Sequence, residues 1–228
     1  MRPCAIYVVA GLCRDGKKRV LACLVRTGRE NLQDWKLVLR GLLERGLRRV
    51  LIAVHDDFSG LLPITKSRFP HADVQLCIVH MQRNAKAHLG KSDATEFSKR
   101  IRAIKTAWNQ EVAGAQFEDL CQRFLSACPS FIAEIRKKRE HCLAFLNCPD
   151  AIRRSLSTTK VVAAVHGQLE IMRRNSGGYF HSHETLQLKL GMALDQLESG
   201  RWRKPASSVQ AALDQFNLLF QARFESES

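Results

Sequence analysis

The sequence predicts an α/β protein whose later part is entirely helical. Two β-rich runs come first, and alternating helical and strand-like segments follow them up to about residue 83. Beyond that point the chain consists of helix-forming stretches with apolar stripes and contains no convincing strand. The 228 residues are enough for one domain with a sizeable core, or for one domain that carries a large insertion.

The first two runs predict an antiparallel hairpin. Residues 4–12 and 19–25 are apolar and rich in β-branched side chains, and Asp15-Gly16 between them is a turn signal. A helix is predicted over residues 31–46, where apolar side chains recur at helical spacing up to Gly46, a residue typical of a helix end.

The next strand is predicted over residues 49–54, a continuous apolar run that is expected for a strand buried on both faces. It ends at His55-Asp56-Asp57. A short helix over residues 60–69 and a strand over residues 72–79 then lead to His80.

Helices are predicted for the rest of the chain. They extend from about residue 84 to 155. Trp108 in this region is expected to lie in the core rather than to stack on a base. A further helix from about residue 158 is stopped by Ser176-Gly177-Gly178. Helices then continue through Glu198 and again from Ala206.

The charge favours a polyanionic partner. Lys and Arg number 36 against 22 Asp and Glu, which gives a formal net charge of +14. Nucleic acid is the first expectation, because each neutralised phosphate releases counterions, while a basic inert surface and anionic lipid are the alternatives. Taken singly, each basic cluster is explained by a helix face exposed to solvent. Taken together, the clusters support a DNA-binding surface. The clusters are Arg100 to Lys105, Arg136 to Arg139, Arg153-Arg154, Arg173-Arg174 and Arg201 to Lys204.

Several functional classes are not indicated. No apolar run approaches the roughly 20 residues of a membrane span. No P-loop, G-x-S-x-G or dinucleotide fingerprint points to a small-molecule substrate. The eight scattered cysteines include no C-x-x-C pair, so reduced thiols in a cytoplasmic protein are expected, most of them in the core.

Three consecutive motifs resemble one family. They are W-x-x-V-L-x-x-L-x-x-R-G over Trp35 to Gly46, V-L-I-A-V-H-D-D-F-S-G-L over Val50 to Leu61, and F-P-x-A-x-V-Q-L-C-I-V-H-x-x-R-N over Phe69 to Asn84. This block resembles Mutator-type transposases of bacterial insertion sequences. Further blocks extend the resemblance over nearly the whole chain, at residues 11–18, 149–154, 158–159, 177–180 and 201–205.

The resemblance implies a ribonuclease-H-like core interrupted by a helical insertion. On this basis residues 1–83 are the first part of the core, 84–155 the insertion, 156–205 the remainder of the core, and 206–228 a C-terminal helix and tail. It also implies three carboxylates, in the order Asp, Asp, Glu, that hold two Mg²⁺ ions for DNA strand cleavage and transfer. Mg²⁺ prefers oxygen ligands, and a metal pair can stabilise both ends of an in-line displacement.

The second family Asp corresponds to Asp56, which follows the predicted strand and lies four residues before Gly60. Its position agrees with the carboxyl end of a strand, where α/β sheets place their sites. The alternative is an Asp that caps the following helix. Asp57 stands where the family usually has Gly, so it is an additional acid.

The first Asp and the Glu that the resemblance implies have no counterpart in this sequence. The first Asp is expected on a strand ahead of Ala5, and Asp15 is explained by the hairpin turn. The Glu position, counted from the family's Thr-Thr, corresponds to Ala163. Glu170 lies roughly 10 Å further along the helix and is a poor substitute. We therefore expect weak or absent Mg²⁺ binding, with Asp56 as the one metal ligand carried over.

Other residues are assigned supporting roles. Cys77 and His80 are too few for a structural zinc site, and the resemblance implies that they support the core beside the active site. Arg83 and Lys86 could contact phosphate, and so could Arg173 and Arg174.

The functional expectation is a Mutator-type transposase that acts at terminal inverted repeats of double-stranded DNA, in a truncated and substituted copy that is inactive on its own. Homo-oligomerisation and association with the nucleoid are also expected. The alternative is a DNA-binding or regulatory remnant that associates with a full-length transposase. Because the strand that carries the first Asp should lie between the hairpin and the Asp56 strand, poor solubility of the isolated chain is predicted.

Overall fold

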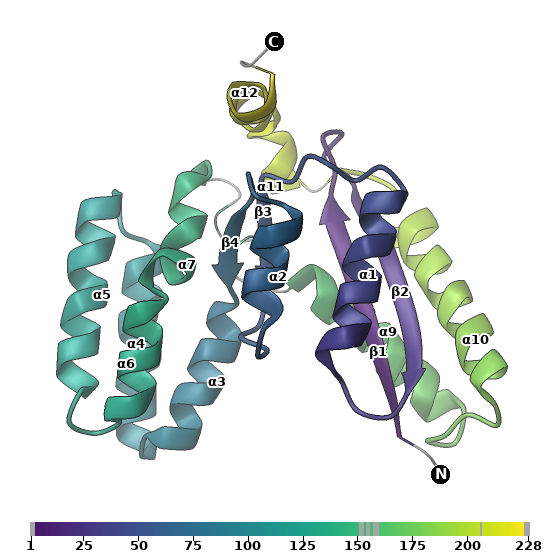
Figure 1. The fold of residues 1–228 in the computed structure, drawn as a ribbon, viewed down its shortest axis with the longest axis horizontal. Helices are drawn as coiled ribbons and strands as arrows, with labels where there is room; N and C mark the ends of the chain where they lie inside the picture. Colours follow the sequence, from purple (N-terminus) through teal and green to yellow (C-terminus); the bar gives the residue numbers. More distant parts are fainter. Residues whose placement is uncertain (1–2, 151–152, 154–155, 157–159, 206, 226–228) are drawn as a thin grey trace. The chain divides into compact units, whose positions relative to one another are not determined.

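The structure is a computed structural model, and it describes residues 3–150, 153, 156, 160–205 and 207–225 (Figure 1). The chain forms two compact units. Unit 1 contains residues 1–49, 67–69 and 160–228, and unit 2 contains residues 50–66 and 70–159.

The predicted hairpin is confirmed and belongs to unit 1. Strands β1 (Cys4–Leu12) and β2 (Lys18–Thr27) pair antiparallel, with one register shift between Val9 and Ala10. The turn uses Gly16 at φ +75°, a conformation that favours glycine, and the Asp15 carboxylate accepts a hydrogen bond from the backbone N–H of Lys17.

One face of the hairpin packs against helix α1 (Leu32–Glu44) through Tyr7, whose ring contacts Trp35 edge-on. The Tyr7 hydroxyl donates to Asp34 and accepts from the backbone N–H of Asn31, the residue that caps α1. Gly46, at φ +92°, follows the last turn, as the sequence predicted. Successive side chains of β1 point to opposite faces of the hairpin. The face that carries Tyr7 is therefore the one that packs against α1.

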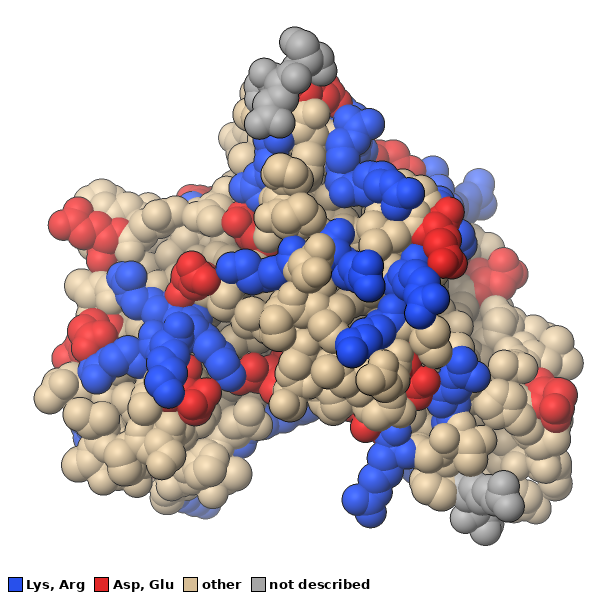
Figure 2. Space-filling model, in the orientation of Figure 1, with Lys and Arg blue, Asp and Glu red and all other residues tan. Residues whose placement is uncertain are grey.

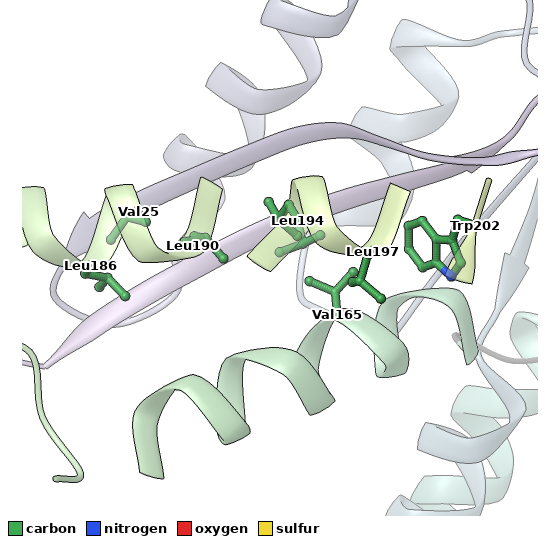
Figure 3. Close-up of a cluster of buried hydrophobic side chains, with 8 residues drawn as sticks. Val25, Val165, Leu186, Leu190, Leu194, Leu197 and Trp202 are labelled. Carbon is green, nitrogen blue, oxygen red and sulfur yellow. The ribbon is translucent and has the colours of Figure 1, made fainter. Parts of the chain in front are cut away.

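The opposite face of the hairpin carries the core of unit 1, which Figure 3 shows. Val8 and Val25 lie on this face and meet side chains from helices α9 (Lys160–Asn175) and α10 (His183–Gln196). The buried members from α10 and beyond recur at helical spacing, which is the pattern of a helix with one apolar stripe. They are Leu186, Leu190, Leu194, Leu197 and Trp202.

The end of unit 1 is formed by short segments. A π-helical turn, η2 (Leu197–Arg201), places Trp202 in the core, while Arg201, Arg203 and Lys204 remain exposed. Helices α11 (Ser207–Gln210) and α12 (Leu213–Phe224) follow.

Unit 2 begins with a parallel pair of strands, β3 (Ile52–His55) and β4 (Asp73–Leu76), joined by helix α2 (Leu61–Arg68). The expectation that the first of these strands is buried on both faces was wrong. All four residues of β3 are only half-buried, because within the described residues β3 has a strand partner on one side only.

The helical region predicted after residue 83 is confirmed across the described part of unit 2. The predicted strand over residues 72–79 is too long, because Cys77 already precedes the first turn of the next helix. The helices are α3 (Ile78–His88), α4 (Lys91–Lys105), α5 (Gln110–Phe124), α6 (Pro129–Lys137), α7 (Arg139–Leu143) and a 3₁₀ turn, η1 (Ala144–Asn147).

Helices α4, α5 and α6 lie side by side in Figure 1 and enclose the phenylalanines of unit 2, including Phe97, Phe117 and Phe124, which are almost fully buried. Trp108 is not among them, and the prediction of a core position was wrong. It is 78% exposed in the turn between α4 and α5, where Ala107 is the buried residue.

The fold class is thus mixed α/β and mostly helical, as predicted. In the described residues the four strands form two separate two-stranded sheets, and the ribonuclease-H-like assignment stays a prediction.

Thr158-Thr159 and Arg154 lie outside the described residues. Five of the eight cysteines are buried and none of the eight forms a disulfide, in agreement with the expectation of reduced core thiols. No described helix combines the length and the hydropathy needed to span a membrane.

Candidate functional site

The candidate site of unit 2 is the carboxyl end of β3, where His55, Asp56 and Asp57 follow one another. The end of β4 is tied to this point, because the backbone N–H of Cys77 donates to the carbonyl of His55 at 2.7 Å. The strand ends of the parallel pair therefore meet beside Asp56, at the carboxyl end of the strands.

His55 fixes the backbone at this corner. Its Nδ1 lies 2.6 Å from the carbonyl oxygen of Asp56, and its Nε2 is buried with no hydrogen-bond partner among the described residues. Burial lowers the pKa of His55, although the Asp56 carbonyl and the charges of Asp56 and Asp57 act in the opposite direction. The imidazole is consequently neutral at physiological pH.

Asp57 is held by a cation from the helical region. The Nζ of Lys138, between α6 and α7, lies 2.6 Å from Asp57 Oδ2 and 3.5 Å from Glu134 Oε2. Partial burial lowers the pKa of Lys138, but the hydrogen bond to Asp57 and the two negative charges outweigh burial, and its pKa is raised. The ammonium group is therefore fully charged when it contacts Asp57.

Asp56 itself is half-buried, and its carboxylate has no hydrogen bond or ion pair with any residue that the structure describes. The alternative interpretation was that it caps the helix after the strand. Helix α2 begins only at Leu61, and no N–H of its first turn donates to Asp56. Within the described residues, the capping role is not seen.

Gln75 is a site-supporting residue that the sequence analysis missed. Its side chain is completely buried on β4; its Nε2 donates to the carbonyls of Leu76 and Cys142, and its Oε1 accepts from the backbone N–H of Phe145. The glutamine that opens the motif Q-x-C-x-x-H thus attaches α7 and η1 to the strand. The sequence feature that could have identified Gln75 is a polar residue in the middle of an apolar strand, because a buried polar side chain requires hydrogen-bond partners.

The remaining motif residues lie at the end of β4 and on α3. Cys77 is buried at the start of this helix, and the Nδ1 of His80 is buried without a partner among the described residues. Arg83 and Lys86 are both exposed, three residues apart on the same face of α3. Their predicted contact with phosphate is compatible with this exposure and stays a prediction.

The position predicted to correspond to the family Glu lies in unit 1. Ala163 is on the exposed face of α9, one turn from Gly167 and two turns from Glu170, while Val165 points into the core. Glu170 Oε1 forms an exposed ion pair with Arg173 at 2.7 Å, which lowers the pKa of Glu170 chiefly through the hydrogen bond from Arg173. Arg174 is also exposed.

The described residues of unit 2 do not fit a divalent metal site. Among all described residues, no three His, Cys, Asp or Glu side chains gather closely enough to hold an ion. At the end of β3 there are two adjacent carboxylates, one of which is already paired with Lys138. A hard divalent cation needs several oxygen ligands from the protein or its substrate, so this corner alone is a poor site.

Comparison with known proteins shows the family. Residues 1–202 match the model of the transposases of the Mutator family. A transposase for insertion sequence element ISRM3 from Rhizobium meliloti is 28% identical over 221 residues, which cover 96% of this chain and 54% of the relative.

Other relatives agree. A probable transposase for an insertion sequence element from Corynebacterium diphtheriae is 26% identical over 214 residues, covering 91% of this chain and 60% of the relative. A transposase for insertion sequence element IS905 from Lactococcus lactis is 25% identical over 167 residues, covering 72% and 42%. The chain spans roughly half the length of the curated relatives it matches. The chain belongs to the Mutator family of transposases.

Proposed function

We propose that this chain is part of an insertion-sequence transposase that binds duplex DNA and does not cleave it by itself. The family match and relatives named as insertion-sequence transposases support the first half of this proposal. The exposed methyl group of Ala163 supports the second half most directly, because a methyl group cannot ligate a metal ion.

The family chemistry that the proposal starts from is Mg²⁺-dependent strand cleavage and transfer at terminal inverted repeats, on a ribonuclease-H-like core. In this chain, Asp56 is the carboxylate in the position of the second family Asp. Asp57 is paired with Lys138 and so offers less negative charge to a cation than a free acid would. This pairing reduces the attraction for Mg²⁺, and it does so independently of the Ala163 substitution.

The proposal is tested by two measurements on the same purified chain. Binding to a labelled duplex of arbitrary sequence should be detectable and should weaken as salt increases, because phosphate contacts release counterions. Supercoiled plasmid incubated with Mg²⁺ or Mn²⁺ should stay un-nicked. Metal-dependent nicking that disappears in an Asp56→Ala variant would contradict the loss of cleavage, and absence of DNA binding would contradict the first half.

A second candidate function is association with a full-length transposase of the same family. It is favoured by the free edge of β3, which among the described residues has β4 on one side and no strand on the other. An unpaired edge can accept a strand from another chain. Light scattering of this chain mixed with a full-length relative should then show a joint species, and the two chains eluting separately would contradict it.

A further inference from the structure

The distribution of charge differs between the two parts of the chain that hold most of its arginines. Residues 1–49 contain 12 Lys and Arg against 4 Asp and Glu, an excess of 8. Residues 84–150 contain 11 against 8, an excess of only 3. The positive charge is therefore concentrated in the hairpin and α1 rather than in the helical region.

Three of the five arginines of the helical region, Arg100, Arg123 and Arg136, form ion pairs with carboxylates of the same region. Arg123 contacts Glu96 at 2.9 Å and Asp93 at 3.4 Å, and Arg100 contacts Glu96 and Asp119. Figure 2 shows the same interleaving of basic and acidic side chains over this part of the molecule. These ion pairs neutralise part of the positive charge of the helical region.

Four arginines of unit 1 are in a different situation. We name Arg14, Arg45, Arg48 and Arg49 the basic end; they come from the hairpin turn and from the C-terminal end of α1 and the residues after it. Figure 2 shows Lys and Arg side chains gathered on the face that carries this end of α1.

Arg14 and Arg49 are held in place by α12. Their guanidinium carbons lie 4.6 and 5.6 Å from the centre of the Phe220 ring. Both also approach a single carboxylate oxygen of Glu225, at 3.4 and 3.7 Å. Two positive charges that share one negative charge leave a net charge of about +1 on this group.

Arg45 and Arg48 are positioned by carbonyl groups rather than by acids. Arg45 donates to the carbonyls of Gly41 and Leu21, and Arg48 donates to that of Leu43, so both are fixed at the end of α1. Neither forms an ion pair with a carboxylate of the described residues. Because a guanidinium carries five N–H donors and both residues are exposed, each retains donors that these bonds do not use.

We propose that the basic end is a phosphate-binding surface for the backbone of duplex DNA. The inference rests on the proposed function for the choice of DNA as partner, and it adds the place of contact. Fixed guanidinium groups suit phosphate, since little side-chain freedom is lost on binding and two N–H groups can contact one phosphate. The surface takes the backbone of any sequence, because phosphate contacts carry no base information.

The test compares two double variants with equal loss of charge. Arg45→Gln with Arg48→Gln changes the basic end, and Arg100→Gln with Arg123→Gln changes the ion-paired arginines as a control. Affinity for a short labelled duplex is measured by fluorescence anisotropy from about 50 to 200 mM salt. Circular dichroism establishes that each variant is folded before binding is compared.

The basic-end variant should lower the slope of log affinity against log salt by about 1.8, if each arginine contacts one phosphate. The control should leave the slope within about 0.5 of the original chain. An equal decrease of this slope in both variants, or no decrease in the basic-end variant, would overturn the proposal. The proposal that the chain binds DNA would still stand. Absence of binding by the original chain, or binding to anionic vesicles alone, would overturn the proposal together with the choice of DNA as partner.

Discussion

Lys138 Nζ lies 2.6 Å from Asp57 Oδ2, so the acid that is additional to the family pattern is paired with a cation from the helical region. The side chains of the pair are 30% and 36% exposed, respectively. The pair attaches the junction of α6 and α7 to the end of β3. It also places a positive charge beside Asp57, the residue next to Asp56 in the sequence.

Replacing Lys138 should reduce stability slightly. Lys138→Met is expected to lower the free energy of unfolding by about 0.5 kcal/mol, a value typical of partly exposed ion pairs, and the loss should shrink at high salt. Urea denaturation measures it. Lys137→Met is the matched control, because Lys137 is 74% exposed and, among the described residues, forms one ion pair, with Glu134 at 3.6 Å. An effect of Lys138→Met that persists in the Asp57→Asn background would show that the pair is not its cause.

The pairing of Asp57 was not predictable from the sequence, whereas the hairpin was. Asp15-Gly16 specifies the turn through local chemistry, and Gly46 ends α1 for the same kind of reason. Lys138 is 81 positions from Asp57, so only the folding of the helical region brings the two side chains together. Periodicity also could not determine how deeply β3 is buried, because that depends on how many strands flank it.

The candidate site was also only partly predictable, because some of its contacts join residues that are far apart in the sequence. The motif placed Asp56 at a strand end, but it did not show that Gln75 attaches α7 to β4. The exposure of Trp108 was also missed. Its neighbours in the sequence form a helical pattern, and only the turn between α4 and α5 shows that its ring leaves the core.

The buried thiol of Cys142 should make the fold sensitive to alkaline pH. Burial raises its pKa from 9.0 to about 12. The unfolded chain loses this proton near pH 9 while the folded chain retains it, so the free energy of unfolding should fall as pH rises above about 9. Cys142→Ala should show a shallower decline in urea denaturation from about pH 9 to about pH 11.

Cys4 is the control for this measurement, because its thiol is exposed. Cys4→Ala should retain the full decline of the original chain. Identical slopes for Cys142→Ala and the original chain would show that the Cys142 thiol does not contribute to the alkaline loss of stability.

Introducing Glu at Ala163, the position predicted to correspond to the family Glu, should leave the fold intact. Ala163 is exposed on α9, so Ala163→Glu is expected to change the free energy of unfolding by less than about 0.5 kcal/mol. Val165→Glu, two residues along the same helix, should unfold unit 1, because Val165 is fully buried. Thermal melts distinguish the two. A large loss of stability in Ala163→Glu would mean that this position does not face solvent.

The core between the hairpin and α10 should depend on the buried stripe of that helix. Leu190 is 2% exposed within the core cluster, whereas Leu188, two residues earlier, is 68% exposed. Leu190→Ala should therefore cost about 2–5 kcal/mol, through lost burial and the cavity that remains. Leu188→Ala should cost less than about 0.5 kcal/mol, because its side chain gains little from folding. Chemical denaturation of both variants provides the comparison, and similar losses would mean that the assignment of the buried face of α10 is wrong.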